Sequence, residues 1–590
     1  MARGAVANHA KLTWLLLRGG VRQLTGRVLG HPLLRWPLFR FRGDRFLIAP
    51  QDLRTADATL ATEIYSGRFA FAGKVVICDT RSVFEREPPS QEWAAALAGF
   101  GWLRHLRAAD SAITRANARA LIDEWIAAQG TWHPLAWRPD VLSRRIISWL
   151  SQAPFVLQDA DAKFYRRFMR SLMRQVRYLR HTAADARRGV AHMQAVIALT
   201  YVALCIAGQA GRIKAATDRL NREIERQILP DGGHVGRDPG AIIELLLEFL
   251  PLRQIYASRN IAPPQALLNA IDRMMPMLRF FRHSDGTFAH FNGMGVTPVE
   301  LLLTLLAYDE AHGAPFSNAP YSAYQRLEAG GAVIIMDSGR PPPIEMSLEA
   351  HAGCLAFEFS TSKQSLVVVN CGMPTIGRED WRPLARGTAA HSTVTFNETS
   401  SAQFVSSAIF RRVLGGAPII AGPNRVAVSR EDRPGVLMLR ARHDGYARRF
   451  GILHERTLLL AADGSRLEGE DLFLDAGGGP KIRTSRDKFA VRFHLPPAIK
   501  ATKLTDGHGV MMMMPNKEVW TFVAPHDRVE IEDSVYLASP EGARRAMQIV
   551  IHGEAALAPR VIWSFQQANP ATIGTAGARR GRELAPKLPL

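Results

Sequence analysis

Residues 324–336 read YQRLEAGGAVIIM and mark the point at which the chain changes its pattern. The run 332–336 is continuously apolar and contains the β-branched residues Val333, Ile334 and Ile335, which are typical of strands. Comparable short runs follow, separated by Gly, Asp and Pro, at residues 355–359, 365–369, 392–396, 436–441, 454–460 and 519–523. Many strands without long helices between them predict an antiparallel β-sandwich over residues 325–565.

Upstream of this point, apolar residues recur at helical spacing from about residue 92 to residue 312. The predicted helices are 141–150, 164–179, 195–206, 215–228, 241–250, 266–280 and 298–307. Successive antiparallel helices of this length predict a helical toroid, here residues 91–320, preceded by an extension and the start of the helical domain in residues 1–90. The expected fold class is α+β with two domains: an incomplete α/α toroid followed by an antiparallel β-sandwich.

The composition is that of a folded protein with a cationic field. The 590 residues are 47% hydrophobic and 22% charged, and 74 Lys plus Arg against 54 Asp plus Glu give a net charge of +20. Such a charge favours an anionic partner, namely nucleic acid, anionic lipid or an acidic polysaccharide. The sequence has no recognised nucleic-acid-binding motif, so nucleic acid is not expected as a partner. The four cysteines include no CxxC pair, which argues against a disulfide scaffold and a thiolate metal site.

Both ends of the chain are basic. The apolar run 14–17, flanked by Lys11 and Arg18, is too short for a signal peptide or a transmembrane segment. A solvated helix and a basic amphipathic start that touches a membrane surface are the two interpretations of this segment. Residues 567–590 are rich in Ala, Gly, Pro, Arg and Lys without an apolar period, which predicts a disordered basic tail.

Several ordered motifs in both halves resemble the heparinase II/III-like polysaccharide lyases, over about residues 130–480. In the helical half they are Trp137, SRRIISW (143–149), and QILPDGGH (227–234) followed by Arg237-Asp238-Pro239. In the strand half they are AHAGCLAFE (350–358), VNCG (369–372), WR (381–382), TAAHST (388–393), HDGY (443–446), HER (454–456) and LEGED (467–471). The resemblance implies a toroid followed by a sandwich, an acidic polysaccharide as the partner, and a periplasmic or cell-envelope location, although no clear export signal is visible.

The resemblance further implies β-elimination at a uronic acid, a carbon–oxygen lyase reaction. A cationic or hydrogen-bonding group must neutralise the uronate carboxylate while a base removes the C5 proton, and an acid must protonate the leaving oxygen. Carried onto this chain, the neutralising groups are Arg237 and His192, and the proton-transfer groups are His234 and His351. The route requires no cofactor.

The chain departs from the family pattern at three places. Ala191 precedes His192 where the family often has Asn, no tyrosine follows Arg237, and Glu349 stands where the family places its first sandwich histidine. A lyase therefore has a rival hypothesis, a non-catalytic or diverged protein of the cell envelope that binds acidic glycan. The sequence leaves open whether the protein is an enzyme, and its oligomeric state.

Two further groups of residues complete the candidate site. Arg382, Arg386, His290 and Asn292 are expected to bind substrate, because arginine forks suit carboxylates. His351, Asn370 and His391 match positions that hold a structural zinc ion in some relatives of the family, although Asn is a poorer zinc ligand than the aspartate it replaces. The alternative to an occupied zinc site is a hydrogen-bonded cluster.

Overall fold

The structure is a computed structural model of the chain. It describes residues 45–568 except 80, 311–312, 376–377 and 480–486, together with Thr13, Leu16, Leu17 and Gly20. The tail 569–590 and most of the basic N-terminal segment lie outside the described residues. Among the residues that are described, no helix is both long and apolar enough to cross a bilayer.

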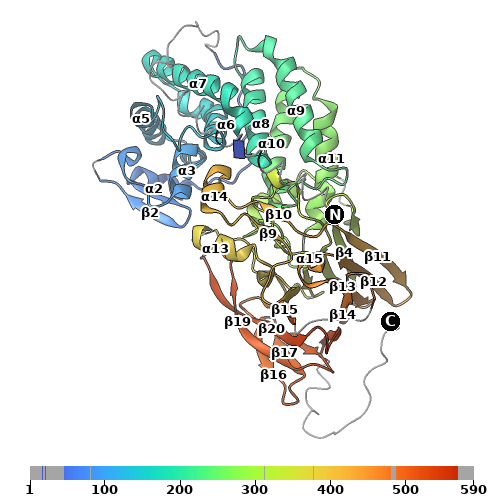
Figure 1. Ribbon diagram of the computed structural model, residues 1–590. Helices are drawn as coiled ribbons and strands as arrows, with labels where there is room; N and C mark the ends of the chain where they lie inside the picture. Colours follow the sequence, from blue (N-terminus) through green and yellow to red (C-terminus); the bar gives the residue numbers. More distant parts are fainter. Residues whose placement is uncertain are drawn as a thin grey trace.

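Helices make up the N-terminal part of the molecule, with one β-hairpin among them (Figure 1). The elements are α2 (Ala58–Tyr65), β1 (Arg68–Phe71), β2 (Lys74–Ile77), α3 (Gln91–Gly99), α4 (Leu103–Ala109), α5 (Ala112–Ala128), α6 (Pro139–Leu157), α7 (Ala162–Thr182), α8 (Val190–Cys205), α9 (Ile213–Gln227), α10 (Pro239–Ser258), α11 (Gln265–Phe280) and α12 (Val299–Leu306).

Burial follows the sequence pattern of these helices. The apolar helices α8 and α10 are buried on nearly all sides, so they form the centre of the domain. The amphipathic helices α7 and α9 bury one face and expose an arginine-rich face. Helix α10 begins at Pro239, two residues before the predicted start at residue 241, because Asp238 caps the amide of Gly240 and Pro239 occupies the first turn.

The C-terminal part is built from antiparallel sheets. The first sheet has the order β3-β4-β5-β6-β7, the second β19-β20-β15-β8 and the third β11-β12-β13-β14-β21-β18-β17-β16, with a small β10-β9 pair beside them. The first-sheet strands and β8 are β3 (Asn318–Ala319), β4 (Tyr324–Ala329), β5 (Ala332–Asp337), β6 (Phe357–Ser360), β7 (Leu366–Val368) and β8 (Val394–Phe396). The later strands are β9 (Gln403–Phe404), β10 (Ile419–Ala421), β11 (Val426–Arg433), β12 (Val436–His443), β13 (Ile452–Ala461), β14 (Arg466–Asp475), β15 (Lys488–His494), β16 (Lys500–Lys503), β17 (Gly509–Met513), β18 (Val519–Val523), β19 (Val529–Tyr536), β20 (Arg544–Glu554) and β21 (Arg560–Gln567). The short helices between strands are α13 (Arg378–Ala385), α14 (Ala408–Leu414) and α15 (Ala447–Phe450).

Strand β5 is the wall that the two halves share. Every residue of β5 is buried, and alternate side chains point to opposite faces of a strand. Val333 and Ile335 belong to the core of the helical domain, whereas Ile334 and Met336 belong to the core of the sandwich. The run is continuously apolar because both faces are covered.

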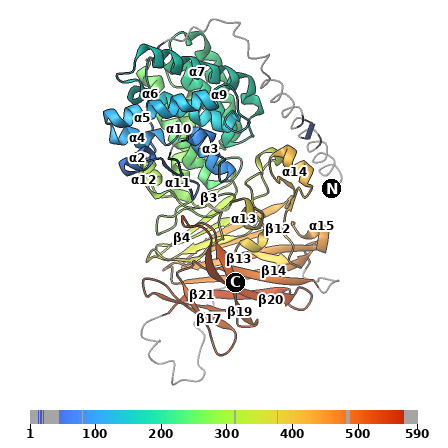
Figure 2. The same cartoon turned by 90° about the vertical axis from the view of Figure 1, so that its left-hand side faces the viewer.

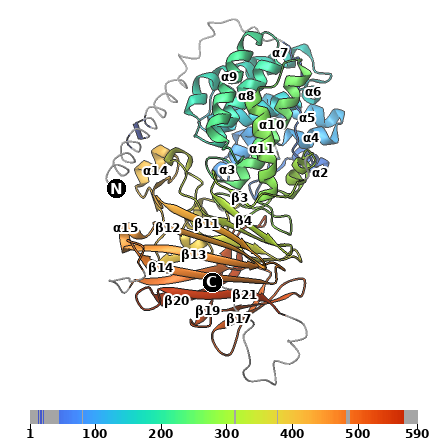
Figure 3. The same ribbon diagram turned by 90° about the vertical axis from the view of Figure 1, so that its right-hand side faces the viewer.

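Figures 2 and 3 show helices α2 to α12 gathered at one end and the three large sheets at the other, with β3 and β4 next to those helices. The predicted order of an incomplete toroid followed by an antiparallel sandwich is confirmed. The helices end at Leu306, and the first strand of the sandwich begins at Asn318.

Candidate functional site

The sequence-predicted site residues lie at the junction between toroid and sandwich and on the adjoining end of the toroid. They come from the loops that follow α9 and α11, from the start of α8, and from the segments between β5 and β8. The structure distributes them over separate hydrogen-bonded groups, most of which are buried.

Arg237 connects the two domains. Its guanidinium donates to the carbonyl oxygens of Ser322 at 2.9 Å, Ala323 at 3.1 Å and Arg340 at 3.2 Å, and it pairs with Asp337 at 2.5 Å. Burial alone would lower the pKa of Arg237, but the charge of Asp337 raises it above the usual value, so the group is a permanent cation. The N–H groups of the Arg237 guanidinium are therefore already bonded to groups of the protein.

Asn292 and Tyr324 extend this group toward His351. The Asn292 amide donates to the Tyr324 hydroxyl at 2.7 Å and to Asp337 at 3.1 Å, and its oxygen accepts the backbone N–H of His351 at 2.9 Å. The Tyr324 hydroxyl donates in turn to the carbonyl of Arg237 at 2.6 Å. We call Arg237, Asn292, Tyr324, Asp337, His351 and His391 the junction network.

His351 and His391 form a pair whose four ring nitrogens all have hydrogen-bond partners. His391 Nδ1 lies 2.7 Å from the carbonyl oxygen of Gly387 and must donate, so Nε2 of the neutral ring accepts. His351 Nδ1 therefore donates to His391 Nε2 at 2.9 Å, and His351 Nε2 accepts the amide of Gly293 at 3.1 Å. Burial lowers the pKa of His391, which keeps this neutral arrangement.

The three proposed zinc ligands are all hydrogen-bonded to protein groups. The ring nitrogens of His351 and His391 are engaged as described, and Asn370 accepts from the amide of Ser392 and donates to Glu358. In the described part of the chain, the group of His, Cys, Asp and Glu side chains close enough to share an ion is Glu530, Glu532 and His552, on the exposed strands β19 and β20. The alternative from the sequence, a hydrogen-bonded histidine cluster, agrees with the geometry of the first pair.

His234 and His192 are joined by a line of buried contacts. His234 Nδ1 accepts the amide of Gly236 at 3.1 Å, and Nε2 donates to Gln227 at 2.9 Å. Gln227 donates to Glu223 at 2.6 Å, and Glu223 lies 2.8 Å from His192 Nδ1. Burial lowers the pKa of His234 to about 4, so the ring is neutral at physiological pH.

His290 belongs to a second buried group, centred on Glu358. The two carboxylate oxygens of Glu358 accept from His283, from the backbone of His290 and from the backbone and side chain of Asn370. Burial would raise the pKa of Glu358, but the charge of His290 and the bonds from both histidines hold it well below its usual range. This carboxylate ties the loop after α11 to strand β6 and to Asn370.

Arg382 and Arg386 differ in exposure. Arg386 is buried, with its N–H groups donated to the carbonyls of Ser347, Ala350 and Ala417, so it braces the loop that carries His351. Arg382 is partly exposed and pairs at 2.6 Å with Glu349, the residue that replaces the family's histidine. Of the predicted substrate-binding residues, Arg382 is therefore the one that reaches solvent.

Sequence reasoning missed the partners that organise these groups. Asp337 and Glu358 each follow or interrupt a run of buried apolar residues in β5 and β6. A carboxylate in such a position needs a buried partner, and this signal was available from the sequence. Glu223 and Gln227 carried no comparable signal, because they lie in a polar, amphipathic helix.

A toroid joined to an antiparallel sandwich through a buried histidine- and arginine-rich junction defines a protein with the polysaccharide-lyase architecture. A sequence model described as heparinase II/III-like, C-terminal, matches residues 311–564. FtsZ-localized protein C of Caulobacter vibrioides is 30% identical over 563 residues, which cover 91% of this chain and 94% of that protein. The chain belongs to the heparinase II/III-like family.

Solved structures agree in fold. The crystal structure of heparinase III matches with a TM-score of 0.70 and 13% identity, over 95% of this chain and 92% of that one. A mutant of the heparan sulfate lyase from Pedobacter heparinus matches with a TM-score of 0.59 and 13% identity, over 95% and 88% of the two chains. At this identity the likeness shows the toroid-plus-sandwich fold.

Proposed function

We propose that this protein binds an acidic polysaccharide at the toroid–sandwich junction without cleaving it. The proposal chooses between the two hypotheses that the sequence left open, a lyase and a glycan-binding protein. The observation that carries it is the hydrogen bonding of His234, His351 and Arg237.

Elimination needs a base with an available lone pair. In the neutral rings of His234 and His351 the lone pair on each acceptor nitrogen takes a backbone N–H, from Gly236 and Gly293 respectively. Proton abstraction by either ring would therefore require a buried amide to lose its partner, which costs about 1–3 kcal/mol before any chemistry begins.

Elimination also needs a cation that neutralises the uronate carboxylate. Arg237 already neutralises Asp337 and donates to three carbonyl oxygens. If a substrate carboxylate recruited this guanidinium, Asp337 would remain as an unpaired buried charge. The family's alternative groups are replaced here by Ala191 and Glu349.

Binding has the electrostatic support that catalysis lacks. Arg187 lies in the same region as Arg382 and Glu349. Burial lowers the pKa of Arg187, the charge of Arg138 lowers it further and the charge of Asp140 raises it, and then Arg382 lowers it and Glu349 raises it. Three arginines thus face two carboxylates. We assign Arg187 and Arg382 as the contacts of the acidic chain, because a carboxylate or sulfate placed beside them would relieve this cationic crowding.

The test measures retention and elimination on the same samples. Purified protein is passed over immobilised heparan, hyaluronan, chondroitin and alginate, and is incubated with each polymer while ultraviolet absorbance of unsaturated uronate is recorded. We expect retention on at least one glycan, weakened about tenfold in Arg187→Gln by loss of a charge-assisted contact, with no rise in absorbance. Arg545→Gln, which removes an exposed arginine (83%) from β20, is the matched control.

A second variant separates a hidden lyase from a binding protein. Glu349→His returns the residue type that the family places at this position. Because Arg237 and His351 remain engaged in the junction network, we expect no elimination from this variant either. One result would overturn the proposal in favour of a lyase: the ultraviolet absorbance rises with the wild type, and the rise is lost in a His351→Ala variant that is still folded.

The nearly full-length match to FtsZ-localized protein C supports a second proposal, that this chain also localises with FtsZ. The match extends across the toroid and the sandwich, since it covers 91% of this chain. A fluorescent fusion, imaged together with labelled FtsZ in the native host, tests it. A uniform distribution that ignores the position of FtsZ would contradict it.

A further inference from the structure

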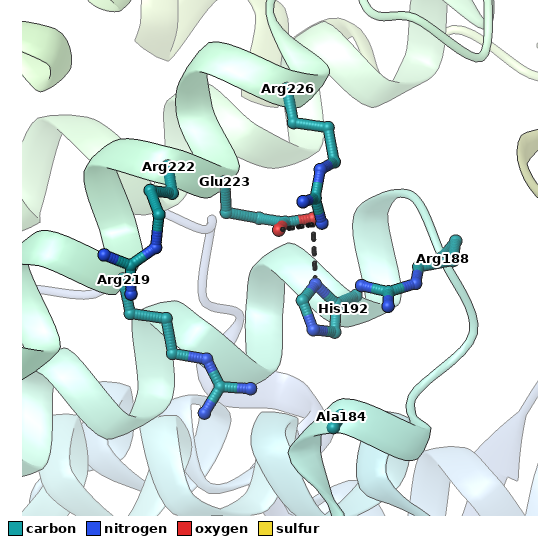
Figure 4. A pocket seen from close by; sticks show the side chains of 7 residues that line it. All are labelled: Ala184, Arg188, His192, Arg219, Arg222, Glu223 and Arg226. Atoms are coloured by element: carbon teal, nitrogen blue, oxygen red, sulfur yellow. Dashed lines mark hydrogen bonds and ion pairs between the residues drawn. The ribbon is translucent and has the colours of Figure 1, made fainter.

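The toroid carries a cationic hollow that the junction network does not use. It has a volume of about 410 Å³ and is lined by Ala184, Arg188, His192, Arg219, Arg222, Glu223 and Arg226 (Figure 4). We call these residues the basic pocket. Its volume falls within the range of about 300–1,000 Å³ that is typical of small-molecule sites.

The one carboxylate of the basic pocket is already committed to protein partners. Glu223 accepts from Gln227 at 2.6 Å and lies 2.8 Å from His192 and 3.4 Å from Arg226. Burial would raise the pKa of Glu223, but these contacts lower it to about 2, so it stays ionised. Four arginines against one glutamate leave a formal excess of 4 − 1 = 3 positive charges.

Arg219 and Arg222 have neither an ion pair nor a hydrogen bond to any residue that the structure describes. Burial lowers the pKa of Arg219, the charge of Glu223 raises it, and the charge of Arg222 lowers it, so the two guanidiniums are close enough to repel. In Figure 4 both side chains extend from α9 beside the His192–Glu223 pair. The carboxylate near these two cations, Glu223, is already bonded to His192, Gln227 and Arg226. Two neighbouring guanidiniums that share one committed carboxylate are arranged to receive a further anion.

We propose that the basic pocket binds a phosphate monoester, carried by a small sugar or by the end of a glycan chain. A phosphate monoester has a charge of about −1.5 to −2 at pH 7 and three acceptor oxygens, which matches two unpaired guanidinium forks. A uronate carboxylate or a sulfate monoester carries a single charge and is satisfied by one fork. Arg188 of the basic pocket directly follows Arg187 in the chain, so the two proposed sites are neighbours that share no assigned residue.

The ligands in the test are a matched pair. Glucose 6-phosphate and glucose 6-sulfate have the same sugar and nearly the same shape but differ in charge. By titration calorimetry on the full-length protein we expect glucose 6-phosphate to bind at least about tenfold more tightly than glucose 6-sulfate. An oligosaccharide with one terminal phosphate identifies the source: equal affinity assigns the site to a small sugar phosphate, and tighter binding assigns it to a glycan end.

The variants locate the binding site. Arg219→Gln/Arg222→Gln should weaken glucose 6-phosphate at least about tenfold, because each substitution removes a charge-assisted contact. Lys214→Gln removes a positive charge from the same helix at a side chain that is 92% exposed and outside the lining, so it should leave the affinity within about twofold. Both variants should fold, because neither arginine makes an ion pair or a hydrogen bond with the described residues that the substitution would remove.

Three results would overturn the proposal: no heat from glucose 6-phosphate, equal affinity for glucose 6-sulfate, or an affinity that the double variant leaves unchanged. Glycan retention measured on the same double variant keeps the two proposals apart. A variant that loses the sugar phosphate but stays on the glycan column supports the basic pocket as an independent site.

Discussion

Replacement of Arg237 by alanine distinguishes a structural role from a substrate-binding role. If Arg237 binds a uronate carboxylate, the substitution should lower the affinity for glycan and change the stability little. If Arg237 instead holds the two domains together, the substitution should lower the stability. The four contacts of Arg237 to Ser322, Ala323, Asp337 and Arg340 predict the second outcome.

The magnitude follows from what the substitution leaves behind. Asp337 has a side chain that is 3% exposed, and without Arg237 its remaining donors are the side-chain amide of Asn292 and the backbone N–H of Gly339. Removal of one partner from a buried ion pair costs about 3–5 kcal/mol. For a cooperative unit of about 150–250 residues this corresponds to a melting temperature lower by about 6–20 °C.

Scanning calorimetry is the suitable assay, because a two-domain chain need not unfold in a single transition. Arg237→Lys keeps the charge near Asp337 but cannot reach the three carbonyl oxygens, so its loss should be intermediate. Arg237→Ala combined with Asp337→Ala should lose less than the sum of the two single variants, by about 0.5–3 kcal/mol. A melting temperature within about 2 °C of the wild type, together with lost glycan retention, would refute the reasoning.

Three further outcomes follow from the buried groups. Burial would raise the pKa of Glu358, but the charge of His290 and its hydrogen bonds hold that pKa well below its usual range. The stabilisation that Glu358 provides is therefore present above the unfolded pKa of about 4.3 and is lost as the pH falls below it. In calorimetry, the melting temperature of Glu358→Gln should fall less steeply below pH ~5 than that of the wild type. The pKa of Glu223 is lowered to about 2 by its contacts despite burial, so acid titration of Glu223→Gln should lack the part of the stability loss that the wild type shows between pH ~4.3 and ~2. The ring nitrogens of His351 and His391 are all hydrogen-bonded to protein groups. We therefore expect that neither EDTA nor added zinc shifts the melting temperature by more than about 1 °C. A rise of several degrees with zinc would contradict this interpretation.

The fold could be predicted because the strongest patterns in the sequence are also the buried ones. The run 332–336 becomes β5 with both faces covered. The apolar stretch 195–206 ends one residue past the buried helix α8, and the stretch 241–250 lies within the buried helix α10. The strands that the sequence did not reveal include β11 and β19, in which charged residues interrupt the apolar ones and most side chains reach solvent. An exposed strand is held by its ladder of backbone bonds, and those leave no mark in the sequence.

The sequence motifs name residues that the structure brings together, but they do not name the partners of those residues. The motifs brought Arg237, Asn292, His351 and His391 into one network, as a shared site requires. Single motifs cannot show which protein group faces each nitrogen, because those groups come from residues tens of positions away. Asp337, which lies 100 positions from Arg237, forms the ion pair that occupies the guanidinium of that arginine.

A side chain can act on a ligand only to the extent that the protein leaves it unpaired. By this criterion the histidines of the junction contribute to stability, because each acceptor nitrogen that a base would need already takes a hydrogen bond. Arg219 and Arg222 on α9 are two cations for which no ion pair or hydrogen bond to a described residue is present. The line from His192 through Glu223 and Gln227 to His234 reaches the junction network through the backbone N–H of Arg237, which donates to the carbonyl of His234 at 2.8 Å.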